Sequence, residues 1–212
     1  MIQCELTIDY QLSKQDAYSL AYLVGCIKEP KIIIELGSWF GQSTVILAMC
    51  MVAFKNCKFY AIDNFMGTGS DLAVRLNENP KKILEENLKN THLIDFVNII
   101  EGDSADTSDK FEDNSIDFIF IDADHRYSGI RKDLLKWYPK VKEDGIFCGH
   151  DFVDFEYDER YIEEDYFEER HHGVIKATQE IFGRLNWLPD KIWWANKKNR
   201  LLYNFRCPKM SI

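Results

Sequence analysis

Short β-branched runs alternate with longer stretches of helical periodicity, and this alternation limits the fold of the chain more than any other feature. Five runs predict strands, at 31–36, 58–63, 96–101, 116–122 and 145–149. The first run is apolar on both faces, as in a parallel strand that helices cover on both sides. Two more runs, at 191–196 and 200–205, flank a short turn and predict an antiparallel hairpin. The sequence thus predicts a single doubly wound α/β domain over 1–212, with a mostly parallel seven-stranded sheet ending in that hairpin.

The sequence also predicts the helices that connect these strands. Ser13 and Asp16 have the spacing of a capping box and predict a helix that continues to Ile27. Further helices are expected over 42–55, 71–90, 129–141 and 173–186, with a proline at position 80 interrupting the second. In such a fold the residues that follow each parallel strand meet at one edge of the sheet, where ligands bind.

Composition narrows the possible partners. The chain carries 26 basic and 35 acidic residues, a net charge of −9, which argues against nucleic acid or an anionic membrane as partner. No apolar run approaches the roughly 20 residues of a membrane-spanning helix, and the first residues lack the pattern of a secretory signal. The six cysteines form no CxxC pair and predict reduced thiols, so we expect a cytoplasmic protein.

The acidic charge is concentrated in one segment. Residues 151–172 include ten acidic side chains, two arginines and six aromatic residues. This composition predicts an insertion over 152–172, anchored by its aromatic residues, that forms either a surface excursion or a lid. Because it starts directly after Asp151, it should overhang the ligand-binding edge, where its carboxylates favour a neutral or cationic substrate.

Polar residues and glycines follow the first three predicted strands. Glu35, Gly37 and Gly41 mark a tight turn into a helix whose free N–H groups suit an anion. Asp63 ends the second strand, where a carboxylate can bind ribose hydroxyls, and 103–104 is an Asp-Ser pair after the third. Each feature alone also fits an ordinary turn, but together they predict a nucleotide-type cofactor.

The fourth and fifth strands end in groups that suit catalysis. Asp122 ends one strand, and His150 with Asp151 ends the next, so a divalent cation, by default Mg²⁺, is expected between them. His125 is placed to accept a proton. The alternatives are that the acids bind no metal, that His125 is structural and that His150 lies outside the metal's ligands. The remaining histidines are expected to be solvated rather than functional, namely His92, His171 and His172.

Several motifs resemble the class I S-adenosylmethionine-dependent methyltransferases. The run ELGSWFGQS at 35–43 is most similar to the catechol and caffeoyl-CoA O-methyltransferases, and GDS at 102–104 fits the same class. IDADHRY at 121–127 and DGIFCGHD at 144–151 are also similar to metal-dependent sugar and macrolide O-methyltransferases. The resemblance covers roughly residues 15–206 and implies a Rossmann-like fold.

The resemblance implies S-adenosylmethionine as cofactor and a role for each matching residue. Ser43 matches the serine that meets the methionine carboxylate, Asp63 the ribose-binding acid, and the pair at 103–104 the adenine-side loop. The expected cofactor-binding residues are Glu35, Gly37, Ser38, Trp39, Gly41, Ser43, Asp63, Asp103 and Ser104.

The resemblance also implies the metal site. Asp122 matches the first metal-binding aspartate, and His125 falls where the relatives place a lysine or histidine base. His150 and Asp151 match paired ligands that are usually Asp-Asp, Asp-Asn or Glu-Asp. His150 departs from that pattern, so it is either a ligand, a base or a residue that orients Asp151.

The predicted function is divalent-metal-assisted O-methylation of a small-molecule or sugar hydroxyl, in a possible homodimer. Metal-independent or N-directed methyl transfer remains open, as does a non-catalytic cofactor-binding subunit. An NAD-dependent oxidoreductase is a further alternative, because Tyr138 and Lys142 have the spacing of its Tyr-x-x-x-Lys pair. That pair is expected at a helix end, which argues against this alternative.

Overall fold

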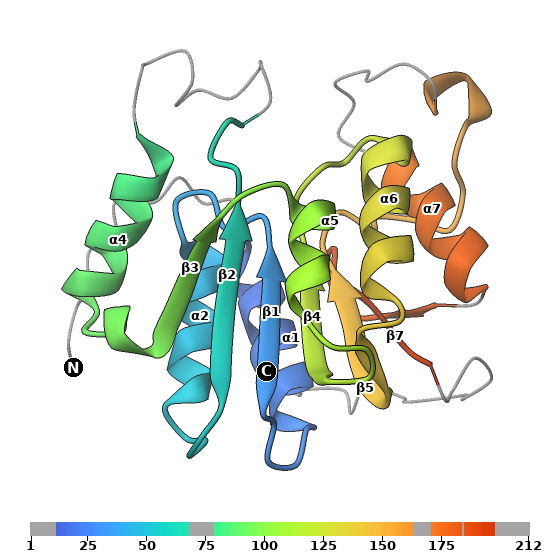
Figure 1. Ribbon diagram of the computed structural model, residues 1–212. Coiled ribbons are helices and arrows are strands. Elements are labelled where there is room, and N and C mark those ends of the chain that lie inside the picture. The colour runs from blue at the N-terminus through green and yellow to red at the C-terminus, as the bar shows by residue number, and fades with distance from the viewer. Residues whose placement is uncertain (1–11, 68–78, 163–170, 184, 198–212) are drawn as a thin grey trace, which may run out of the picture.

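The fold is a seven-stranded sheet with helices on both faces (Figure 1). The computed structural model describes residues 12–67, 79–162, 171–183 and 185–197. The strands run in the order β3-β2-β1-β4-β5-β7-β6. Pairs among the first five strands are parallel, whereas β7 is antiparallel to β5 and β6. Their bounds are β1 (Ile32–Leu36), β2 (Lys58–Asp63), β3 (Val97–Glu101), β4 (Ile116–Ile121), β5 (Val141–Gly149), β6 (Asn186–Trp187) and β7 (Trp193–Asn196).

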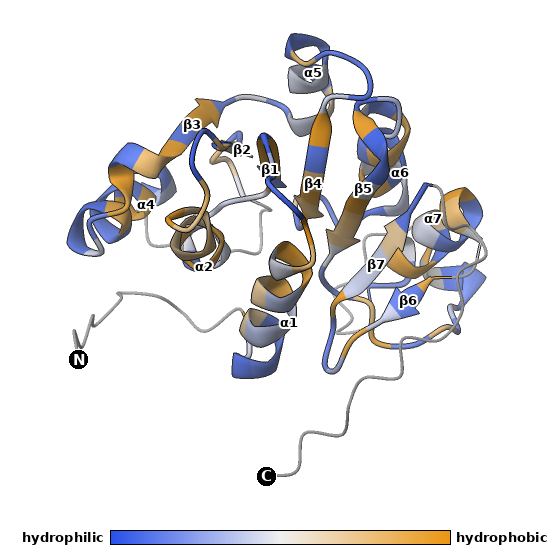
Figure 2. Cartoon of the chain, turned by 90° about the horizontal axis from the view of Figure 1, so that it is seen from below, coloured by the Kyte–Doolittle hydropathy of each residue, from blue (hydrophilic) through white to orange (hydrophobic). Residues whose placement is uncertain are grey.

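Two apolar clusters hold the helices against the sheet. One face is covered by α1 (Lys14–Gly25), α2 (Gln42–Met51) and α4 (Pro80–Asn90), and the other by α5 (Ser104–Thr107), α6 (Tyr127–Trp137) and α7 (His172–Phe182), as Figure 2 shows. Every residue of β4 is buried, because the strand lies at the centre of the sheet and is covered on both sides. Short 3₁₀ turns complete the fold, at η1 (Ile94–Phe96), η2 (Ser108–Lys110) and η3 (Glu159–Tyr161).

The predicted topology is confirmed, while several boundaries differ. The capping box of Ser13 and Asp16 opens α1 as expected. Pro80 begins α4 rather than interrupting a longer helix, because its fixed φ suits a first helical position; residues 68–78 lie outside the described chain. β5 starts at Val141, before the Glu-Asp-Gly turn that was expected to precede it, and α6 ends at Trp137.

The antiparallel end of the sheet is also built differently from the prediction. The partner of β7 is Asn186–Trp187, whose first residue was predicted to end a helix over 173–186. The run at 200–205 that was expected to pair there lies outside the described residues. Gly183 ends α7 early with a φ of 73°, which frees the chain to form β6.

Backbone hydrogen bonds continue the sheet one residue beyond its strand ends. The N–H of Gly37 donates to the carbonyl of Ile62, that of Asp122 to Leu36, and that of His150 to Ile121. The residues that follow β1, β4 and β5 are thereby fixed side by side. This edge lies at the point where the strand order reverses, between β1 and β4.

The start of the acidic segment is anchored in the core. Phe152 is fully buried and packs edge-on against Phe155, and Tyr157 packs on the cluster beneath α6 and α7. Residues 163–170 lie outside the described chain, so the lid prediction for 152–172 is untested there. Within the described ranges, no helix has the length and hydropathy needed to cross a bilayer.

Candidate active site

The glycine turn after β1 lies directly against the end of β4. Gly37 has a φ of 85°, in the left-handed region that favours glycine. A Cβ at this position would lie 2.0 Å from the carbonyl oxygen of Asp122. The missing side chain of Gly37 therefore allows the predicted cofactor turn and the predicted metal ligand to approach each other.

Glu35 lies fully buried beneath this turn. Its Oε2 accepts a 2.5 Å hydrogen bond from the hydroxyl of Thr44, while its Oε1 and the hydroxyl of Ser38 have no hydrogen-bond partner among the described atoms. Burial raises the pKa of Glu35 to about 7, although the bonds from neighbouring hydroxyls act in the opposite direction. Both atoms have essentially no exposed surface, so a ligand can reach them only after the neighbouring side chains move.

A stability measurement can test the state of Glu35. Because its pKa is about 7 when folded against an ordinary value of 4.5, the unfolded chain releases this proton first, and stability falls as pH rises from about 4.5 to about 7. We expect Glu35→Gln to raise the free energy of unfolding by up to about 3 kcal/mol above pH 7, and to change it little near pH 4.5. Urea unfolding across this range measures the difference. Glu86→Gln, on the surface of α4, is the control, and a gain independent of pH contradicts the assignment.

Asp63 holds the glycine turn through its carboxylate. Its Oδ2 accepts hydrogen bonds from the backbone N–H groups of Ser38 and Trp39, both at 2.8 Å, and its Oδ1 accepts one from Phe65. Burial raises its pKa, against the effect of these bonds. The structure thus brings Asp63 together with the turn, and its contact with a ribose stays a prediction.

Asp103 and Ser104 contact α6 instead. The carboxylate of Asp103 caps α5 and lies 3.2 Å from Nζ of Lys132. The hydroxyl of Ser104 donates to Asp133 at 2.6 Å, and burial raises the pKa of Asp133 to about 7. Both predicted residues have structural partners here, and their place beside an adenine stays a prediction.

The predicted metal-binding residues converge. Asp122, His150 and Asp151 each offer a donor atom, and these atoms lie within 4.8 Å of one another. Nδ1 of His150 is 3.2 Å from Oδ1 of Asp151, and its Nε2 is 3.3 Å from Oδ2 of Asp16. Asp151 has a φ of 61°, so the chain turns sharply at this carboxylate.

His125 lies between the two acids. Its Nε2 is 3.2 Å from Oδ1 of Asp122 and 3.1 Å from Oδ2 of Asp151. Burial alone lowers the pKa of His125, but the hydrogen bond to Asp122 and the charges of both acids outweigh it and raise the pKa to about 8. The imidazole therefore interacts directly with both carboxylates.

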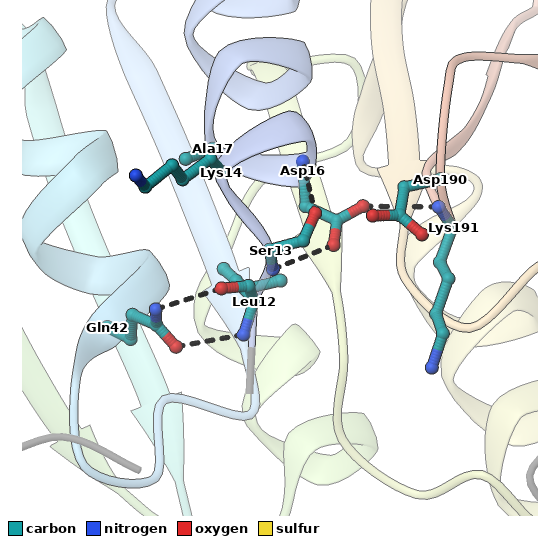
Figure 3. A pocket seen from close by; sticks show the side chains of 8 residues that line it. All are labelled: Leu12, Ser13, Lys14, Asp16, Ala17, Gln42, Asp190 and Lys191. Carbon is teal, nitrogen blue, oxygen red and sulfur yellow. Dashed lines mark hydrogen bonds between the residues drawn. The ribbon is translucent and has the colours of Figure 1, made fainter. Parts of the chain in front are cut away.

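Asp16 is a site residue that the sequence assigned only to a helix cap. Its carboxylate is buried and accepts hydrogen bonds from the N–H groups of Ser13 and Lys191 (Figure 3). It also lies 3.3 Å from Nε2 of His150. It also lines a pocket of about 370 Å³ between the first turns of α1 and α2 and the loop before β7. The capping pattern gave no sign of this contact, because only the docking of α1 on the sheet creates it.

Two histidines that were expected to be solvated have partners in the site or its surroundings, although His171 stays partly exposed. His172 is buried, and its Nδ1 accepts the N–H of Asp158. His171 directs Nε2 to within 3.6 Å of Oδ2 of Asp151, and its ring centroid is 4.5 Å from that of His125. The expectation for His92 is confirmed, because that residue is exposed.

A comparison with family models identifies the family of the chain. A family model described as a methyltransferase domain matches residues 34–152, from β1 to just beyond β5. The match covers more than half of the chain, so the chain belongs to this methyltransferase family. No curated protein matches the chain by sequence.

Solved structures share the fold over most of their length. The O-methyltransferase NovP has a TM-score of 0.65 at 17% identity, over 86% of this chain and 79% of that one. TomG of Streptomyces achromogenes, an O-methyltransferase of tomaymycin synthesis in complex with SAM, has 0.62 at 14%, over 89% and 82%. An O-methyltransferase of Bacillus cereus in complex with SAH has 0.59 at 19%, over 90% and 84%. The fold and the family together identify the chain as a class I S-adenosylmethionine-dependent methyltransferase.

Proposed function

We propose that this methyltransferase transfers the methyl group of S-adenosylmethionine to a hydroxyl of a small molecule or sugar, with the assistance of a divalent metal ion. The observation that carries the proposal is the convergence of Asp122, His150 and Asp151 at the sheet edge. Gly37 places the cofactor turn against the same strand end. The O-methyltransferases of similar fold support the choice of oxygen as acceptor atom.

The donor set fits a hard divalent ion such as Mg²⁺ or Mn²⁺. Asp122 and Asp151 supply two carboxylates, and His150 can present Nδ1 beside Asp151 while Asp16 faces its other nitrogen. When bound, the ion supplies Lewis-acid stabilisation of the developing alkoxide and a template for the acceptor. Metal-independent transfer is the alternative, and turnover that survives complete chelation would establish it.

His125 is the proposed general base. Its Nε2 lies within 3.2 Å of both Asp122 and Asp151, the two carboxylates that are proposed to hold the metal ion and, with it, the acceptor hydroxyl. Above its pKa of about 8, the ring is neutral and can accept the hydroxyl proton at Nε2 as the oxygen attacks the methyl carbon and the C–S bond breaks. Asp122 and Asp151 stay in contact with the ring, so their negative charges stabilise the resulting imidazolium.

The cofactor is proposed to bind along the glycine turn. The methionine end of S-adenosylmethionine would lie against the turn that Glu35 and Ser38 help to form, with Ser43 at the first turn of α2 for its carboxylate. Asp63 would meet the ribose, and Asp103 with Ser104 the adenine side. The proposal also includes three further features: a lid formed by residues 152–172, a homodimeric state and a cytoplasmic location.

Calorimetry with two candidate cofactors tests the proposal. We titrate S-adenosylmethionine and NAD into the protein, with and without Mg²⁺, and expect saturable binding of the first only. Binding of NAD instead would favour the oxidoreductase alternative. Binding of S-adenosylmethionine without any methyl transfer to a panel of hydroxyl acceptors would favour a non-catalytic subunit.

A further inference from the structure

A second set of donor atoms lies beside the proposed Mg²⁺ ligands. It consists of His125, His171 and Asp151, each of which offers a ligand atom within 4.8 Å of the other two, and Nε2 of both histidines faces Oδ2 of Asp151. We propose that this set binds Zn²⁺ or a similar late first-row metal ion, and that its occupation inhibits methyl transfer. The binding itself is independent of the proposed function, whereas the inhibition rests on His125 being the base.

The distances suit a common ion. Ligand atoms bound to one metal at about 2.1 Å are separated by about 3.0 Å in octahedral and about 3.4 Å in tetrahedral geometry. Oδ2 of Asp151 lies 3.1 Å from the His125 nitrogen and 3.6 Å from the His171 nitrogen. Both distances to Oδ2 of Asp151 are therefore close to the separations expected for ligands of one ion.

The backbone holds these side chains in place. Gly173 packs against the loop that carries His125: a Cβ there would lie 2.6 Å from the His125 carbonyl oxygen and 2.4 Å from the nitrogen of Tyr127. This close approach fixes the start of α7, and with it His171, next to His125. Asp151 and His171 both have left-handed backbones, with φ of 61° and 39°, a conformation that surrounding structure must stabilise in residues other than glycine.

The types of ligand in this set determine which metal ion it prefers. Two imidazoles and one carboxylate suit Zn²⁺, Cu²⁺ or Co²⁺ better than Mg²⁺, which prefers oxygen ligands. The set uses Oδ2 of Asp151, while Oδ1 faces His150 and lies 3.7 Å from Nζ of Lys191. Asp122, 3.2 Å from the His125 nitrogen, adds a nearby negative charge that favours a cation.

Occupation of this set removes the proposed base. The lone pair on Nε2 of His125 that would accept the hydroxyl proton is the same lone pair that would bind the metal. A ring with Zn²⁺ at Nε2 and a proton at Nδ1 has no free lone pair for the substrate proton. Zn²⁺ should therefore inhibit without displacing S-adenosylmethionine.

Direct metal binding tests the site. Zn²⁺ affinity is measured by competition with a chromophoric chelator, and Co²⁺ is added as a spectroscopic probe of coordination. We expect the wild type to bind one Zn²⁺ at least about tenfold more tightly than His171→Ala or His171→Asn, with a d–d absorption of bound Co²⁺ that both variants lose. Asparagine adopts the left-handed backbone readily, so its circular dichroism and melting temperature should match the wild type.

Two further variants separate the two donor sets. His92→Ala removes an exposed histidine and should leave Zn²⁺ affinity unchanged. Asp122→Asn removes a proposed Mg²⁺ ligand but no member of this set, so we expect its Zn²⁺ affinity to stay within about tenfold of the wild type. Equal Zn²⁺ affinity in the wild type and both His171 variants overturns the proposed site, whatever the enzyme's activity.

An activity measurement tests the inhibition. In the presence of excess Mg²⁺, Zn²⁺ should suppress methyl transfer by the wild type but not by His171→Asn at the same concentration. Equal inhibition of both proteins overturns the inhibitory role. If no acceptor is methylated at all, the proposed function fails, while the binding experiment still decides whether this site exists.

Discussion

Asp122→Ala should lower metal-dependent methyl transfer by at least about a thousandfold, while the affinity for S-adenosylmethionine stays within about tenfold of the wild type. The variant removes one carboxylate of the proposed metal site and the hydrogen-bond partner of His125 at 3.2 Å. It leaves the backbone N–H of residue 122 in place to donate to Leu36. Metal positioning and base orientation are therefore lost together, and the cofactor turn is retained.

The measurements for this variant are product formation over a range of Mn²⁺ or Mg²⁺ concentrations, and calorimetric titration of the cofactor. Asp124→Asn is the matched control, because Asp124 lies in the same loop but pairs with Arg126. This control should retain both metal-dependent turnover and cofactor binding. Loss of cofactor affinity together with turnover in Asp122→Ala, or turnover that survives, would contradict the proposed division of roles.

The second large effect is expected on folding. Gly37→Ala should destabilise the chain by more than about 4 kcal/mol or prevent its folding. The left-handed backbone costs about 1–2 kcal/mol for alanine, and its Cβ would overlap the Asp122 carbonyl oxygen, 2.0 Å away. That oxygen cannot withdraw easily, because the backbone at Asp122 is hydrogen-bonded to β1. Urea unfolding measures the loss of stability.

The variant Gly183→Ala separates the conformational cost of a positive φ from the steric overlap of the new Cβ. Gly183 also has a positive φ, of 73°, but a Cβ there would meet no atom within 4 Å. Because its ψ of −104° lies outside the ordinary left-handed region, we expect this control to fold and to lose only a conformational contribution of about 1–3 kcal/mol, less than Gly37→Ala loses. If the two variants are equally destabilised, close packing of the glycine turn against β4 is not what requires glycine at position 37.

The topology and the strand-end residues could be predicted because each depends on local pattern. A buried parallel strand reads as a continuous apolar run, and the residue after it must lie at the carboxyl edge. This is why Asp122, His150 and Asp151 could be placed together before any coordinates. The end of the sheet was less predictable, because β6 has only two residues and no periodicity of its own.

The contacts that complete the site could not be predicted in the same way. Asp16 reaches His150 only because α1 docks on the sheet, and a capping pattern describes the helix end but not its neighbour. His171 reaches Asp151 only because Gly173 lets α7 approach the loop after β4. Both depend on tertiary packing between elements far apart in sequence, for which local patterns carry no signal.

The backbone bonds that extend the sheet past its strand ends have a dynamic consequence. Amides at Gly37, Asp122 and His150 belong to the same cooperative unit as the central strands, so their hydrogens should exchange only when the sheet itself opens. Entry and exit of ligands must then proceed through rearrangement of side chains and surrounding loops. The framework that bears the chemistry stays in place during each catalytic cycle.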